Sequence, residues 1–283
     1  MEPHVLPIRS SVSLFGLVPG SLWAEVTASI KSAAQHASVW GNDRKLLIVS
    51  ADVKQAFQST TIANVKRAMD VLEVPPWFQY GILAPLVGEI TTLTFEGLAV
   101  ENVEVDRHIR TGGNESPELW NLVVCAMWAS VIASWDQEGL GYSCFNPNDA
   151  RGDGLSRTAV VNHLFYADNV FVLGSDVVTF QKQLTDLTYV LRDWGFEWKA
   201  DSLEVAAVGF DTIASSSQID TPVPDFSVDV EGRSTKFRRV EVLNVLGNDV
   251  ATDFRKPHVD LTRRLPLRRG LSLGTRGTFD HGQ

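Results

Sequence analysis

Residues 159–174, with the sequence AVVNHLFYADNVFVLG, carry the pattern that decides the fold. β-Branched and aromatic residues fill both halves and Asp168-Asn169 stands between them, which predicts a strand, a turn and a second strand. A polar pair such as Asp168-Asn169 between two buried apolar strands lowers the stability of the protein unless it binds a ligand. Because Asp-Asn is also an ordinary turn sequence, this segment alone leaves a purely structural turn and a binding site equally open.

A second carboxylate follows another apolar strand. Residues 46–52, LLIVSAD, predict a buried strand that delivers Asp52 at its end. Two carboxylates brought together from neighbouring strand ends repel each other unless a cation lies between them. Mg²⁺ prefers such oxygen ligands and commonly accompanies phosphates, and a pair of these ions is a common device of phosphoryl transfer. The two strand ends therefore predict a site for Mg²⁺-assisted phosphate chemistry.

Composition limits the class of protein. The chain has 283 residues, of which 44% are hydrophobic and 21% charged, as expected for one large or two small globular domains. A net charge of −9 is unfavourable for a wide nucleic-acid-binding face. Two cysteines, Cys125 and Cys144, and no apparent signal peptide predict an intracellular, reducing compartment, the nucleus or the cytoplasm. The uncharged stretch Leu119–Trp135 predicts a buried core helix rather than a membrane span.

Helices and strands alternate along the chain in the manner of an α+β fold. Ser116 and Pro117 are typical of the N-cap and first position of the long apolar helix. The expected helices cover about 22–37, 61–74, 116–135 and 177–194, and the expected strands and hairpins cover 46–52, 91–109, 159–174, 196–210 and 228–245. This order predicts an antiparallel sheet with helices on one face.

Two segments are expected to lie outside the regular elements. The loop 144–157 is rich in Asn and Asp but lacks the alternating ligand spacing of a calcium loop, so it predicts a plain surface loop. From Asp253 onward the chain is basic and rich in turn residues. This tail is interpreted as frayed, with a small nucleic-acid contact as the alternative.

Six blocks of the chain occur in a recognisable order. They are Phe15–Ser21 (FGLVPGS), Asp52–Phe57 (DVKQAF), Arg110–Trp120 (RTGGNESPELW), Phe165–Asn169 (FYADN), Gly195–Trp198 (GFEW) and Val245–Gly247 (VLG). Together they resemble the reverse transcriptase domain of non-LTR (LINE-type) retrotransposons over most of the chain. Each block alone is a weak signal, and their number and order make the resemblance strong.

The resemblance implies a polymerase palm, a ferredoxin- or RRM-like antiparallel sheet, with truncated fingers and thumb. It implies a residual fingers segment at 1–45, the palm at 46–250 and a basic, poorly ordered tail at 251–283. The implied activity is RNA-directed DNA polymerisation, with an RNA template, a DNA primer and a dNTP as partners and two Mg²⁺ ions as cofactor.

The resemblance also implies roles for single residues. Asp52 and Asp168 would bind the metal, with Asn169 as the third catalytic residue and the Val53 carbonyl assisting. The Phe57 ring would lie beside the incoming sugar, with an ordinary core aromatic as the alternative. The remaining substrate-binding positions implied by the blocks are Arg110, Gly112, Ser116, Pro117 and Tyr166.

Several positions depart from the family. Asn169 stands where the family has a second Asp, Thr111 replaces a Gln, and Ser202 aligns with a Lys, although Lys199 lies three residues away. The basic fingers are expected to be missing and the thumb to be incomplete. Two alternatives to a polymerase therefore stay open: an inactive retroelement relic that binds nucleic acid or protein weakly, and another palm-like metal enzyme such as a nucleotide cyclase.

Overall fold

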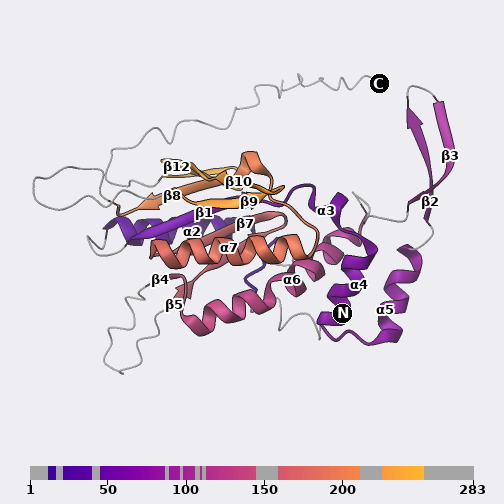
Figure 1. Ribbon diagram of the computed structural model, residues 1–283, viewed down its shortest axis with the longest axis horizontal. Helices are drawn as coiled ribbons and strands as arrows, with labels where there is room; N and C mark the ends of the chain where they lie inside the picture. Colours follow the sequence, from indigo (N-terminus) through magenta and orange to yellow (C-terminus); the bar gives the residue numbers. More distant parts are fainter. Residues whose placement is uncertain are drawn as a thin grey trace, which may run out of the picture.

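The computed structural model describes residues 12–16, 22–39, 45–86, 89–95, 98–105, 109, 113–144, 159–210 and 225–251. At its centre is a five-stranded sheet in the order β11-β8-β1-β7-β6 (Figure 1). The strands are β1 (Leu46–Asp52), β6 (His163–Tyr166), β7 (Asn169–Gly174), β8 (Glu204–Val208) and β11 (Arg238–Arg239). All neighbours are antiparallel except β8 and β11, which are parallel. The fold is α+β as predicted, but the sheet is mixed rather than purely antiparallel.

The central strand β1 has the bounds that the sequence predicts. Its first six residues are all buried, and only Asp52 at the end is partly exposed. Leu47 and Val49 belong to the hydrophobic core on one face of the sheet, whereas Leu46 and Ile48 belong to the core on the other face. Because a central strand with two apolar faces must be covered on both, the sheet lies between two layers.

Three helices cover the first face: α4 (Ile62–Val71), α6 (Ser116–Glu138) and α7 (Val177–Asp193). Within the described part of the chain, α6 is the one helix long and apolar enough to cross a membrane, and 67% of its most apolar window is buried inside the protein. It is therefore a core helix, as predicted. The α7 stripe predicted from its periodicity is buried at Phe180, Leu184, Leu187 and Leu191.

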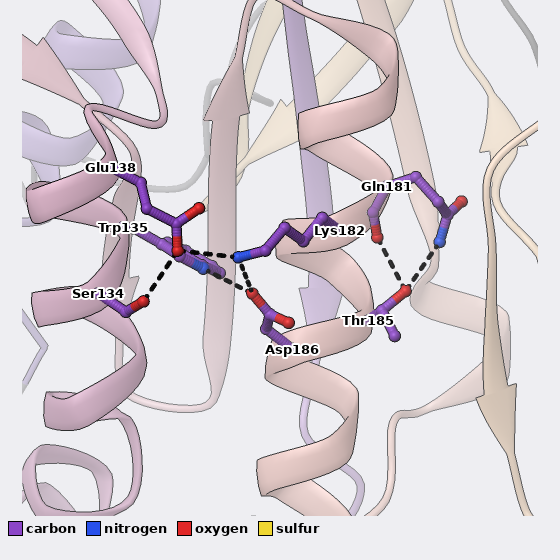
Figure 2. A network of polar contacts seen from close by, with 7 residues as sticks. All are labelled: Ser134, Trp135, Glu138, Gln181, Lys182, Thr185 and Asp186. Carbon is purple, nitrogen blue, oxygen red and sulfur yellow. Dashed lines mark hydrogen bonds and ion pairs between the residues drawn. The ribbon is translucent and has the colours of Figure 1, made fainter.

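Polar contacts join the sides of α6 and α7 that face each other (Figure 2). The Lys182 ammonium lies 3.1 Å from carboxylate oxygens of both Glu138 on α6 and Asp186 on α7. Trp135 Nε1 donates to the Asp186 carboxylate at 3.0 Å, and the Ser134 hydroxyl donates to Glu138 at 3.0 Å. These bonds link the last turn of α6 to the middle of α7.

The second face is covered by α2 (Trp23–Val39) and the hairpin of β12 (Val242–Val245) and β13 (Asn248–Ala251). This corrects the prediction that helices cover one face only. The physical reason is that Phe171 and Leu173 on β7 point to this second face and are fully buried there.

The remaining elements surround this core. They are α3 (Ala56–Ser59), α5 (Pro76–Leu83), η1 (Ala84–Leu86), β2 (Glu89–Phe95), β3 (Leu98–Val105), β4 (Tyr142–Cys144), β5 (Ala159–Val161), η3 (Ala200–Ser202), β9 (Ser227–Val230) and β10 (Arg233–Lys236). The hairpin predicted over 91–109 is β2–β3, which extends away from the sheet beyond α5 in Figure 1. The pair of strands predicted over 228–245 is instead four short strands, β9 to β12. Most of the loop predicted at 144–157 and the tail from 252 lie outside the described residues.

The starts of α4 and α6 show how the first turn of each helix is accommodated. Thr61 caps α4 as part of a capping box, in which its hydroxyl accepts from Asn64 N and Asn64 Oδ1 accepts from Thr61 N. At α6 the prediction is one residue out, because the cap is Glu115 and Ser116 is already helical. Pro117 is tolerated there because no position in the first turn needs an intrahelical N–H bond.

Candidate active site

The sheet brings the two predicted carboxylates to the same end. Asp52 is the last residue of β1 and lies opposite Asn169, the first residue of β7. Asp168 directly precedes Asn169, and its carbonyl accepts a hydrogen bond of 3.0 Å from Val53 N. Because N–H and C=O of one residue in an extended chain point to the same side, the Val53 carbonyl faces the β6–β7 turn too.

The turn itself differs from the prediction by one residue. Its two central residues are Ala167 and Asp168, whereas Asn169 already belongs to β7 and pairs with Tyr166 on β6. Ala167 has a φ of 55°, a conformation that costs a residue with a Cβ roughly 1–2 kcal/mol. Glycine is the usual residue at such a position. Contacts around the turn must therefore hold Ala167 in place.

The Trp120 side chain on α6 supplies one of these contacts. Its Nε1 donates to the Ala167 carbonyl at 3.0 Å. The indole is fully buried and packs against the rings of Phe57 and Phe196, at centroid distances of 6.2 and 5.5 Å. Phe57 is half-buried and packs against the hydrophobic core, as the core alternative left open by the sequence requires.

Residues 12–16 supply a second contact, on the outer edge of β6. Phe15 N donates to Phe165 O at 2.8 Å, and Phe165 N donates to Ser13 O at 3.0 Å. Gly16 then lies against the turn, where a Cβ added to it would come within 2.6 Å of the Tyr166 carbonyl carbon. Only glycine allows the two backbones to approach this closely.

Negative charge is concentrated around Asp52. Burial raises the pKa of its carboxyl above the ordinary value, the nearby Asp168 raises it further, and Asp201 and Glu204 add smaller contributions. Lys199 opposes them and lowers this pKa. The Lys199 ammonium lies 4.0 Å from Asp52 Oδ2. On balance the pKa of Asp52 is raised, so Lys199 does not fully neutralise the negative charge around this carboxyl.

Ser202 and Lys199 have different roles at the end of β1. Ser202 Oγ accepts from Asp52 N and donates to Lys199 O, both at 2.8 Å, so the hydroxyl fixes the backbone. Lys199 N donates to Asp52 O at 2.9 Å. The sequence pointed to Lys199 only as a neighbour of the aligned position. It could not show that the 3₁₀ turn η3 folds back and directs the ammonium to Asp52.

The other predicted residues are distributed around this site. Tyr166 is half-buried beside the turn, Ser116 is buried and Pro117 half-buried at the start of α6. Asn169 Nδ2 donates to Asp168 Oδ1 at 3.3 Å, so its amide nitrogen faces the carboxylate. Arg110, Thr111 and Gly112 lie outside the described residues.

The donor set fits a hard divalent cation. Asp52 and Asp168 offer carboxylate oxygens, Val53 offers a carbonyl on the same side, and the Asp52 side chain remains 27% exposed and so accessible. Oxygen donors of this kind are those that Mg²⁺ selects. Among the described residues, this site included, no group of three or more His, Cys, Asp or Glu side chains is arranged to hold a metal, so the site offers two carboxylates and a carbonyl.

No family model matches this chain, and no curated protein matches it either. Solved structures with a similar course of the chain include apo telomerase from Candida tropicalis truncated from the C-terminal domain and telomerase from Candida albicans in complex with a TWJ fragment of telomeric RNA. Their sequences are 11% and 10% identical, 83% of this chain is covered in each, and both TM-scores are 0.42. The chain spans 42% and 36% of their lengths.

The Trp120 hydrogen bond can be separated from its packing by comparison with Trp128. Both indoles are buried on α6, but Trp128 Nε1 has no hydrogen-bond partner among the residues that the structure describes. We expect Trp120→Phe to lower the free energy of unfolding by about 1–2 kcal/mol more than Trp128→Phe, because only Trp120→Phe leaves the Ala167 carbonyl without its donor. Urea denaturation measures both changes. An equal or larger loss for Trp128→Phe would show that the indole N–H does not hold the turn.

The close approach of Gly16 gives a second prediction. Gly16→Ala should destabilise the protein by about 1–3 kcal/mol, because its Cβ must push the β6–β7 turn away. Gly81→Ala on α5 is the matched control, since nothing lies within 4 Å of its added Cβ, and alanine should there be neutral or stabilising by up to about 1 kcal/mol. Thermal or urea unfolding distinguishes the two. Equal stability of the two variants would contradict the contact with the turn.

Proposed function

We propose that this chain contains the palm of an RNA-directed DNA polymerase related to the reverse transcriptases of non-LTR retrotransposons. The observation that carries the proposal is the juxtaposition of Asp52 and Asp168 at one end of the sheet, where burial and the charge of Asp168 raise the pKa of the Asp52 carboxyl. Such a pair is the protein's part of a metal-dependent nucleotidyl-transfer site.

The arrangement of the six sequence blocks supports the proposal. Gly16 lies against the β6–β7 turn, Trp120 donates to it, and Val53 pairs with both Asp168 and Trp198. Residues from five blocks that are scattered along the chain thus meet around one turn. Random similarity in short motifs gives no reason for such convergence.

Each residue of the site has a definable task in this reaction. The Asp52 and Asp168 carboxylates, with the Val53 carbonyl, would hold Mg²⁺, whose charge, when bound, stabilises phosphate oxygens and activates a primer 3′-hydroxyl. Trp120 and Gly16 fix the turn that carries Asp168. Phe57, which is only half-buried, would lie beside the sugar of the dNTP. RNA template and DNA primer would be the macromolecular partners.

Asn169 limits the activity that this site can reach. An Asp at the same position would add a negative charge near the cation, and a pair of charges about 4 Å apart is worth about 4 kcal/mol at an effective dielectric of 20. A third of this value corresponds to about tenfold in metal affinity. The Asn169 amide, which donates to Asp168, therefore favours a second candidate function, a catalytically inactive domain that binds nucleic acid or protein weakly.

Primer extension on an RNA template tests the proposed function. With Mg²⁺ or Mn²⁺ we expect slow dNTP incorporation, which Asp52→Asn and Asp168→Asn abolish and Asn169→Asp raises about tenfold because it restores charge at the cation. Asp201→Asn is the control, since it removes a nearby carboxylate that is not part of the pair.

Two results would decide against polymerase activity. Absence of product from both the folded chain and Asn169→Asp favours the inactive domain. Product formation that survives Asp168→Asn would mean that the carboxylate pair is not the reaction centre.

A further inference from the structure

The Lys199 backbone is hydrogen-bonded to Asp52, and its ammonium lies close to the Asp52 carboxylate. The ammonium lies 4.0 Å from Asp52 Oδ2, and the backbones of the two residues are joined by the bond from Lys199 N to Asp52 O. Ser202 Oγ links the same two residues through Asp52 N and Lys199 O. The backbone of Lys199 is therefore held beside Asp52, whichever rotamer its side chain adopts.

Other cations close to this end of β1 already have their own partners. Lys54 Nζ lies 2.5 Å from a Glu231 carboxylate oxygen, and the Arg238 guanidinium pairs with Glu204. In the described part of the chain, Lys199 is the basic residue that forms an ion pair with Asp52. The Lys199 side chain is 52% exposed, so its ammonium can move away into solvent.

We infer that Lys199 is a built-in counter-ion of the carboxylate pair, which a divalent cation must displace from Asp52 before it binds. This inference rests on the metal site of the proposed function. It adds that the chain sets the affinity of this site through its own competing cation. Lys199 would not touch the substrate; it would act through its ion pair with Asp52.

The size of the effect follows from the charges. A divalent cation on the Asp52 carboxylate would approach an ammonium that already lies 4.0 Å from Oδ2. The ammonium must therefore leave, which breaks an ion pair whose lysine is 52% exposed, and the loss of such a pair corresponds to up to about fivefold in a binding constant. Removal of the ammonium should tighten metal binding by this factor.

Calorimetric titration of the full chain with Mn²⁺ tests the inference without any requirement for catalysis. We expect Lys199→Gln to bind Mn²⁺ up to about fivefold more tightly than the unchanged protein, because the competing charge is gone. Lys199→Arg, which keeps the charge, should retain the original affinity. Lys54→Gln is the matched control, because it removes an equal charge from a lysine that pairs with Glu231 instead.

The outcomes separate this inference from the proposed function. Equal or weaker Mn²⁺ affinity of Lys199→Gln overturns the competing role, while measurable binding that Asp168→Asn abolishes leaves the carboxylate metal site intact. Equal tightening by Lys54→Gln also overturns it, because net charge alone would then explain the effect. Absence of Mn²⁺ binding in both the unchanged protein and Lys199→Gln overturns the inference together with the metal site.

Discussion

The site depends on one constraint: the β1–β7 ladder holds two carboxylates together although their charges repel. Six consecutive residues of β1 are buried, and each large apolar side chain among them contributes roughly 1.5–3 kcal/mol through burial. This total exceeds the few kcal/mol of repulsion between two partly solvated carboxylates. The register that buries the strand also sets Asp52 opposite Asn169. Negative charge therefore accumulates at the end of β1 as a consequence of the packing of the sheet.

The turn that carries Asp168 shows how the rest of the fold supports this constraint. Ala167 adopts a conformation that glycine would adopt more easily, and the strain is held by neighbours from distant parts of the sequence. Trp120 binds its carbonyl from α6, and Gly16 packs against it from the N-terminal segment. Strain that is held by several independent contacts is typical of positions where a side chain must be presented in one orientation.

Local patterns predicted much of this structure, and tertiary contacts explain what they missed. β1 and the stripe of α7 follow from runs and periods of apolar residues, and Asp52 and Asp168 follow from their places at strand ends. The cover of α2 on the second face depends on which strands become central, which no local period reveals. The approach of Lys199 to Asp52 depends on η3 folding back, and Asn169 falls in the strand because the turn needs only two residues.

A titration of the Asp52 carboxyl, followed by carbon NMR in the absence of divalent cations, tests the central claim most directly. In the unchanged protein Asp52 should titrate above the ordinary range for aspartate, because burial and the charge of Asp168 both raise its pKa. In Asp168→Asn the pKa of Asp52 should fall, yet remain raised by burial. A pKa of Asp52 that does not change in Asp168→Asn would show that the two carboxylates do not share one site.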